Sequence, residues 1–307
     1  MYQGFFGAFL LAAQTGWKEW QYYEDDLAHF LLLAIPIMFL YGICIGSFLN
    51  VVIIRLPRGE SLIKRSSHCM TCGAKIRIID LIPVFSWLFL RGKCHSCGEK
   101  ISPRYPIVES LNGLLYVANL LIFGANLNMI LMCCFTSVLV VIGFMDWDTM
   151  EVDLRVLACI LVLTVPSFFV VRELTIWDIL IGAACVGIPF FLIGEISRIF
   201  IKKKTGEDYR GIELGDTYLM AVSGLYLGWK AMVPAVFIGI LLAAICGLIL
   251  KKISGDSKFA LCPYLCVGLL IGAMFGEEIV NWYIERNAWL FESETISYYS
   301  SCLFPTV

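Results

Sequence analysis

Two aspartates lie where apolar segments of membrane-spanning length meet more polar sequence. Asp146 directly follows Leu127–Met145, about nineteen mostly apolar residues, roughly the length that crosses a bilayer core. Asp216 follows Gly215 at the start of another apolar segment, and glycine permits tight packing beside the carboxylate. Two facing carboxylates share one proton, so one can deprotonate a water while the other polarises a peptide carbonyl. The pair predicts aspartic-protease chemistry; the alternative for Asp146 is a helix end that exits into water with an acidic loop.

Four cysteines have the spacing of metal ligands. Cys69 and Cys72 form one pair and Cys94 and Cys97 form a second, and each pair is followed by a glycine. Two such pairs make a tetrahedral four-sulfur site of the zinc-ribbon kind. Because four protein ligands leave no open position, we expect a structural Zn²⁺ ion. A redox pair and unligated thiols are the alternatives.

The composition excludes an ordinary soluble domain. Hydrophobic residues make up 59% of the 307 residues, charged residues make up 16%, and the mean hydropathy is +0.81. These values are typical of an all-α polytopic membrane protein. About eight transmembrane helices are expected, near Leu27–Ile54, Tyr105–Phe123, Leu127–Met145, Leu154–Val171, Ile176–Ile201, Leu214–Gly228, Ala231–Leu250 and Ala260–Ile284.

The basic residues set the expected orientation. Most of the 23 Lys and Arg residues fall in connections on one side of an eight-span arrangement, chiefly the loop 55–104 between helices one and two. Because basic loops remain in the cytoplasm, we expect this cysteine-bearing loop to be cytoplasmic and both termini to face outward. The net charge of −2 is close to neutral, and no nucleic-acid partner is expected. The sequence leaves the oligomeric state open.

The expected organisation has five parts. They are an outward-facing, aromatic-rich interfacial segment 1–26, transmembrane helix one at 27–54, the cytoplasmic zinc-ribbon-like loop 55–104, a seven-helix core 105–284 and an outward-facing tail 285–307.

Three local predictions concern the first two helices and the loop between them. Gly42 and Gly46 stand four residues apart, which favours close packing of a neighbouring helix, with a substrate groove as the alternative. Asp80–Leu90 is apolar but too short to span, so we expect an arm at the membrane surface. Glu109 is expected in the first turn of helix two, where a carboxylate favours the helix N-terminus.

These residues together resemble the bacterial type IV prepilin peptidases, a family of Gly-x-Gly-Asp intramembrane aspartyl proteases. The likeness runs from about Gly46 to Gly268. It is carried by the two cysteine pairs and by these segments: Gly46-Ser-Phe-Leu-Asn50-Val-Val-Ile-Ile-Arg55-Leu-Pro57, Ile82-Pro83, Arg104-Tyr-Pro-Ile-Val-Glu109, the Asp146 stretch, Leu214-Gly-Asp216, Gly224-Leu-Tyr-Leu-Gly-Trp229 and Pro263-Tyr-Leu265.

The resemblance implies a bifunctional enzyme of the bacterial cytoplasmic (inner) membrane. As an aspartic endopeptidase, it would cut the short positive leader from type IV prepilins or pseudopilins just after a glycine, at the cytoplasmic face. It would then N-methylate the new terminus with S-adenosylmethionine. The family's catalytic aspartates correspond to Asp146 and Asp216. The large loop is the implied location of the methyl donor, with no residue assigned to it.

Three departures from the family pattern bear on this expectation. Glu213 stands at the first glycine of Gly-x-Gly-Asp, Asp153 replaces a proline seven residues after the first aspartate, and Tyr218 replaces a common lysine. A catalytically impaired pilin-binding scaffold is therefore one alternative. An ion-coupled membrane carrier that uses paired acids is the other, although no inverted repeat supports it.

Overall fold

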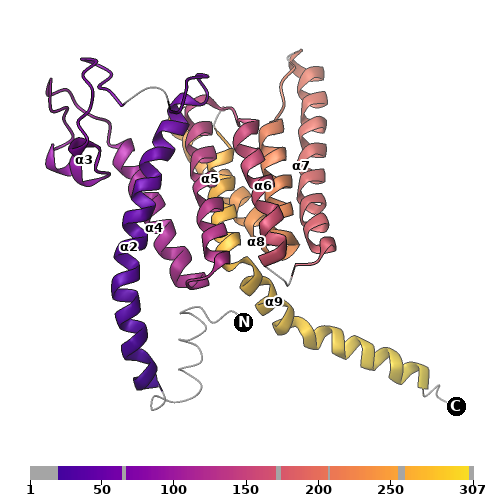
Figure 1. The fold of residues 1–307 in the computed structure, drawn as a ribbon. Coiled ribbons are helices and arrows are strands. Elements are labelled where there is room, and N and C mark those ends of the chain that lie inside the picture. Colours follow the sequence, from indigo (N-terminus) through magenta and orange to yellow (C-terminus); the bar gives the residue numbers. More distant parts are fainter. Residues whose placement is uncertain (1–19, 64–66, 171–173, 207, 255–259, 304–307) are drawn as a thin grey trace.

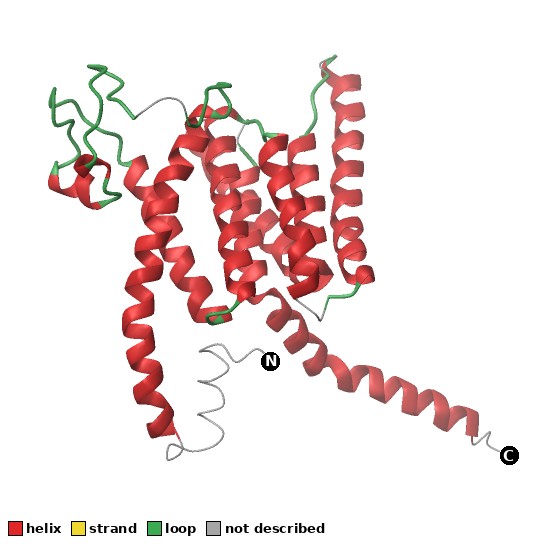
Figure 2. Cartoon of the chain, in the orientation of Figure 1, coloured by secondary structure: helices red, strands yellow, loops and turns green. Residues whose placement is uncertain are grey.

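The protein is all-α over the residues described by its structure, a computed structural model covering 20–63, 67–170, 174–206, 208–254 and 260–303. The elements are α2 (Trp20–Arg55), the short helix η1 (Ile79–Leu81), α3 (Phe85–Phe89), α4 (Arg104–Phe123), α5 (Leu127–Thr149), α6 (Leu154–Val170), α7 (Ile176–Thr205), α8 (Leu214–Ser254) and α9 (Cys262–Leu303) (Figure 1). No strand occurs within these ranges (Figure 2), and β-pairing there is limited to two isolated bridges. The prediction of an all-α protein is therefore confirmed for the described residues.

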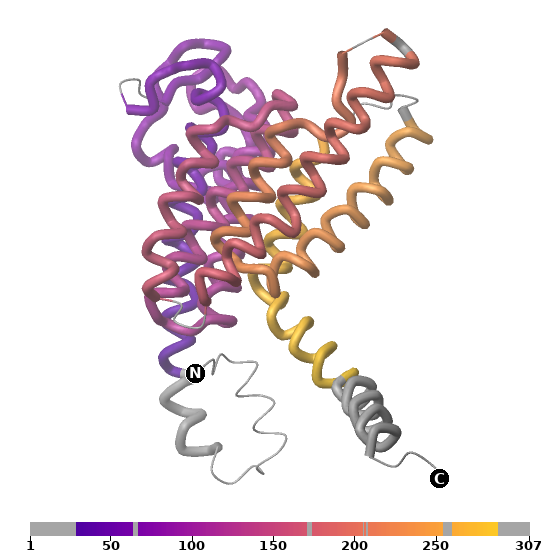
Figure 3. The backbone as a smooth tube through the Cα atoms, turned by 90° about the vertical axis from the view of Figure 1, so that its right-hand side faces the viewer, coloured from indigo at the N-terminus to yellow at the C-terminus, as the bar shows by residue number. Residues whose placement is uncertain are grey.

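Six of the described helices are long and apolar enough to cross a membrane by length and composition, namely α2, α4, α5, α7, α8 and α9. The shorter apolar helix α6 spans Leu154–Val170. Helix α8 contains both segments that the sequence separates at Gly228. That glycine has φ 75° and ψ 171°, which interrupts the helix. Figure 3 shows the later half of α8 turning away and running to the end where α7 stops.

The helix ends differ from the apolar segments. Helix α2 begins at Trp20 rather than Leu27, and α9 continues past Ile284 to Leu303, pointing away from the bundle (Figure 1). Hydropathy detects only the apolar part of a helix. The backbone hydrogen bonds that define a helix do not depend on side-chain polarity, so the helix can extend into polar residues. The predicted interfacial segment 1–26 lies largely outside the described residues.

Helices α2 and α4 pack closely at two glycines. A Cβ added at Gly42 would lie 2.7 Å from the Gly113 Cα, and one added at Gly46 would lie 2.8 Å from the Glu109 Cα. The Asn112 amide donates to the Gly42 carbonyl oxygen over 2.8 Å. The packing interpretation of these glycines is confirmed.

Helix α5 is the centre of the bundle and contacts α2, α4, α6 and α9. Asn126 caps its start by accepting a hydrogen bond from the Met129 N–H over 2.8 Å. The helix ends at Thr149, and the next residue, Met150, has a left-handed conformation and donates its N–H to the Asp146 carbonyl. Its inward side chains are fully buried: Phe135, Leu139, Ile142 and Met145.

Candidate active site

The four predicted cysteine ligands form one cluster. The sulfur atoms of Cys69, Cys72, Cys94 and Cys97 all lie within 4.8 Å of one another. In each pair the glycine after the second cysteine has a positive φ and donates its N–H to the first cysteine's carbonyl oxygen. Hydrogen bonds from the Cys72 and Thr71 amides lower the pKa of Cys69 to about 6. At Cys97 the backbone hydrogen bond from Glu99 lowers the pKa, but desolvation and the neighbouring thiols together raise it to about 12, so the thiolate is favoured at Cys69 and needs a bound cation at Cys97. The cluster therefore fits a four-coordinate metal ion.

Glu109 holds the arm of this loop against the bundle. Its Oε2 accepts a hydrogen bond from the Val84 N–H over 2.7 Å, and its side chain is buried. The expectation for Glu109 was wrong, because α4 begins at Arg104 and has no acid in its first turn. Val84 itself has a strained backbone, with φ 61° and ψ −55°. The buried carboxylate thus fixes a strained turn of the loop to the helix pair α2–α4.

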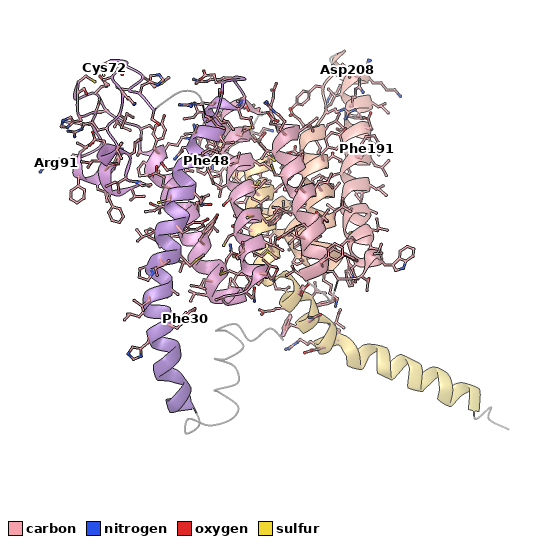
Figure 4. All side chains as sticks on the ribbon, viewed as in Figure 1. Phe30, Phe48, Cys72, Arg91, Phe191 and Asp208 are labelled. Atoms are coloured by element: carbon pink, nitrogen blue, oxygen red, sulfur yellow. The ribbon has the colours of Figure 1, made fainter. Side chains whose placement is uncertain are left out.

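The arm presents apolar side chains to its surroundings. Leu81, Ile82, Leu88 and Phe89 are all exposed in the isolated chain. Figure 4 places Arg91, which follows the arm, beside α3 at the outer edge of the molecule. The membrane-surface location of the arm stays a prediction.

Asp146 lies in the last turn of α5 and is buried, with 5% of its surface exposed. Its Oδ2 has no hydrogen-bond partner among the described residues. A carboxylate at a helix end that simply exits into water would be solvated, so the burial of Asp146 argues against that alternative.

Asp216 lies in the first turn of α8 and is equally buried. A Cβ added at Gly215 would lie 2.8 Å from the Val152 Cβ, so the segment after Asp146 packs directly on the residue before Asp216. The tight packing predicted for Gly215 is confirmed. The two carboxyl groups lie close enough to interact electrostatically. The fold therefore brings together the two acids that the sequence selected.

Cys262 is the residue that sequence reasoning missed. It is the first residue of α9, and its side chain is fully buried. Its backbone N–H lies against the Asp146 carboxyl group, and its thiol lies against Asp216. The start of a helix favours negative charge, so α9 supports an ionised aspartate here. The available signal was Pro263 directly after Cys262, because proline is favoured in the first turn of a helix.

Four further acids surround the aspartate pair. Asp148 forms an ion pair with Arg104 over 2.6 Å, and Asp153 forms one with Arg155 over 2.6 Å. The hydrogen bonds from Arg155 lower the pKa of Asp153. Partial desolvation raises the pKa of Glu213, and the charge of Glu151 raises it further.

The connection from α7 to α8 is tied back onto α7. Arg210 pairs with Glu195, and Arg198 pairs with Asp208 over 2.5 Å. The Gly211 N–H donates to the Ser197 hydroxyl over 3.0 Å. These contacts fix the path of the chain just before Glu213 and Asp216. The site as a whole can supply a proton acceptor and a proton donor to a water and a peptide carbonyl held between its two acids.

Comparison with known proteins identifies the family. Residues 40–123 match the bacterial peptidase A24 N-terminal domain, which includes the cysteine cluster. Residues 133–248 match the type IV leader peptidase family, which includes both aspartates. No solved structure matches the chain significantly.

Curated relatives agree with these matches. Three of them, each named prepilin leader peptidase/N-methyltransferase, come from Myxococcus xanthus, Bacillus subtilis and Aeromonas hydrophila, with identities of 32%, 29% and 32%. The alignments cover 71%, 82% and 84% of this chain. They cover 63% of the Myxococcus protein, 98% of the Bacillus protein and 97% of the Aeromonas protein. The chain therefore belongs to the bacterial A24 peptidases, the type IV prepilin leader peptidase family.

Proposed function

We propose that this chain is an intramembrane aspartic endopeptidase that removes the leader of type IV prepilins or pseudopilins, with Asp146 and Asp216 as its catalytic acids. The observation that carries the proposal is the pair of buried carboxyl groups, contributed by α5 and α8, that interact across the junction of Gly215 and Val152. The names of the relatives supply the substrate class.

The chemistry follows from the shared proton of the pair. The ionised carboxylate removes a proton from a water, and the protonated one donates a hydrogen bond to the scissile carbonyl oxygen. Attack by the water gives a tetrahedral intermediate, and the acid that gained the proton passes it to the departing amine. The unpartnered Oδ2 of Asp146 is an acceptor suited to that water. The N-terminus of α9 stabilises the carboxylate that is ionised at each stage.

The proposed arrangement in the membrane has eight crossings, with the loop 55–104 in the cytoplasm, a peptidase core at 105–284 and both termini outside. The break at Gly228 supports it, because each half of α8 can then cross separately. Cys72 and Asp208 lie at the same end of the molecule (Figure 4), as expected if both connections are cytoplasmic. Both aspartates lie near the ends of spans on this side, where a basic leader joined to an apolar helix would place its scissile bond.

A zinc ion held by the four cysteines completes the loop in this proposal. Four thiolates within reach of one another suit Zn²⁺, and the role is structural because no open ligand position remains. The ion would hold the two cysteine turns together and keep the loop folded over α2 and α4.

N-methylation with S-adenosylmethionine is the second activity in this proposal, and the names of the relatives support it. The loop contains an open cavity of about 440 Å³ whose lining includes Trp87, Arg91, Lys93 and Lys100. An aromatic ring and cationic side chains can hold a purine and a carboxylate, both of which the donor carries. Donor binding is therefore to be tested here first.

The test is mass spectrometry of a prepilin incubated with purified protein, with and without S-adenosylmethionine. Wild-type protein should release the leader, and the product should gain about 14 Da, one methyl group, only when the donor is present. Asp146→Asn and Asp216→Asn should each abolish leader removal while the protein stays folded. Glu278→Gln is the matched control, because this acid is exposed and lies in α9 away from the aspartate pair.

Processing by both aspartate variants would refute the assignment of the catalytic pair. An intact prepilin that still binds the wild-type protein would favour the pilin-binding scaffold. Ion-dependent flux in liposomes without processing would favour the carrier.

A further inference from the structure

Only some of the four acids around the aspartate pair form an ion pair with a basic side chain. Asp148 and Asp153 each have an arginine partner at 2.6 Å. Glu151 and Glu213 are exposed, and within the described part of the chain neither carboxylate has an ion-pair or hydrogen-bond partner. Two anionic side chains next to the catalytic pair thus lack the cation that their neighbours have.

The fold places these two glutamates together. Val152, which follows Glu151, packs on Gly215, two residues after Glu213. The charges of Glu151 and Glu213 interact, and partial desolvation together with this repulsion raises the pKa of Glu213. A cation placed between two such carboxylates would relieve the repulsion.

A buried oxygen atom of the neighbouring Asp146 also lacks a polar partner. Asp146 interacts electrostatically with Glu213, and its Oδ2 is buried without a hydrogen-bond partner among the described residues. A buried oxygen of this kind costs free energy unless a bound molecule satisfies it. The unpartnered oxygen marks where the reacting centre of a bound substrate is held, and the two unpaired glutamates beside it indicate where a cationic group of that substrate lies.

We propose that Glu151 and Glu213 form an acidic subsite that binds a lysine or arginine side chain of the peptide substrate, next to the scissile bond. This inference rests on the proposed function, because the peptide must be held at Asp146 and Asp216. Both glutamates lie outside the membrane-spanning helices, so the bound residue belongs to the water-exposed side of the cleavage point. An extended peptide advances about 3.3 Å per residue, so a side chain close to the bond on that side can reach carboxylates that flank the aspartate pair, and the second residue before the bond is the position to test.

The subsite gives a role to a departure of this chain from the family pattern. Glu213 stands where the Gly-x-Gly-Asp motif begins with glycine, so half of the subsite is absent from a chain that has glycine there. Cleavage by this chain therefore depends more strongly on a cationic residue than cleavage by a chain with glycine at this position.

The test compares prepilin peptides that differ only in the second residue before the scissile bond, which is Lys, Gln or Glu. Wild-type protein should cleave the Lys peptide with a kcat/KM about fivefold above that of the Gln peptide, the range of an exposed ion pair. Glu213→Gln and Glu151→Gln should each remove most of this preference, and Glu213→Lys should reverse it in favour of the Glu peptide. Glu213→Gly provides a second neutral variant. Glu278→Gln is the matched control, because this exposed glutamate lies in α9 away from the site.

Equal cleavage of the Lys and Gln peptides by wild-type protein would overturn the inference and leave the peptidase intact. An unchanged preference in both neutral Glu213 variants would do the same. If wild-type protein cleaves no peptide at all, the proposed function fails and the subsite fails with it.

Discussion

The contact between Gly215 and Val152 offers the sharpest test of how the site is built. In Gly215→Ala, the new Cβ would lie 2.8 Å from the Val152 Cβ and 2.9 Å from its Cγ2. Carbon atoms in contact prefer about 3.5–4.0 Å, so the start of α8 and the segment after Asp146 must separate by roughly 1 Å.

The effect on stability should be small. Overpacking of this kind costs about 1–3 kcal/mol, and alanine in place of glycine in a helix returns up to about 1 kcal/mol. The effect on the reaction should be large, because Asp216 directly follows the displaced residue. A misplacement of about 1 Å can lower an enzymatic rate about 100-fold. We therefore expect folded Gly215→Ala protein that removes the leader about 100 times more slowly.

The assay is the rate of leader removal, measured beside thermal unfolding in detergent. Val152→Gly removes both atoms that meet the new methyl group, so Gly215→Ala/Val152→Gly should recover most of the lost rate. Gly143→Ala is the matched control, because a Cβ at that helical glycine in α5 would meet its nearest neighbour at 3.7 Å, an ordinary contact. A full rate in Gly215→Ala, or a double variant no faster than the single one, would refute this reasoning.

Three further predictions concern the rest of the framework. Asp148→Asn breaks the 2.6 Å ion pair between α4 and α5 and should lower the free energy of unfolding by about 1 kcal/mol. Arg104→Met breaks the same pair and also removes the contacts of Arg104 with Phe144, so it should cost more, and the double variant should be no worse than Arg104→Met alone in a double-mutant cycle. Gly228→Ala forces alanine to φ 75° and places its Cβ 2.9 Å from Leu174, so the protein should lose about 1–3 kcal/mol and melt at a lower Tm. Purified protein should carry about one zinc per chain by metal analysis, and a chelator or Cys94→Ser should open the cysteine loop to limited proteolysis; a metal-free wild-type protein with a protected loop would contradict this.

Much of the framework could be predicted from the sequence because it depends on residues that are near one another in the chain. The lengths of the apolar segments predicted the long helices. The spacing of the two cysteine pairs predicted the four-cysteine cluster, in which each pair lies in a turn closed by a hydrogen bond within a few residues. The position of Asp146 at the end of an apolar segment and the position of Gly215 before Asp216 were equally local features, and the structure buries both aspartates.

The tertiary structure decided which distant residues meet. Glu109 bonds to Val84 across the loop rather than serving its own helix, because the packing of α2 on α4 buries its side chain. Cys262 contacts both aspartates although it is far from each in the sequence.

The distribution of charge at the mouth of the site was also beyond local reasoning. Four acids flank the aspartates. The pairing of Asp153 with Arg155, two residues later, is local, but nothing in the spacing of the other three acids shows which of them has an arginine partner. Arg104 is far from Asp148 in the sequence, and only the packing of α4 against α5 brings its guanidinium to that carboxylate. The sequence determined which groups are available, because residue type and local spacing are written in the chain. The fold determined which of them are paired, because pairing depends on contacts between helices that hydropathy does not encode.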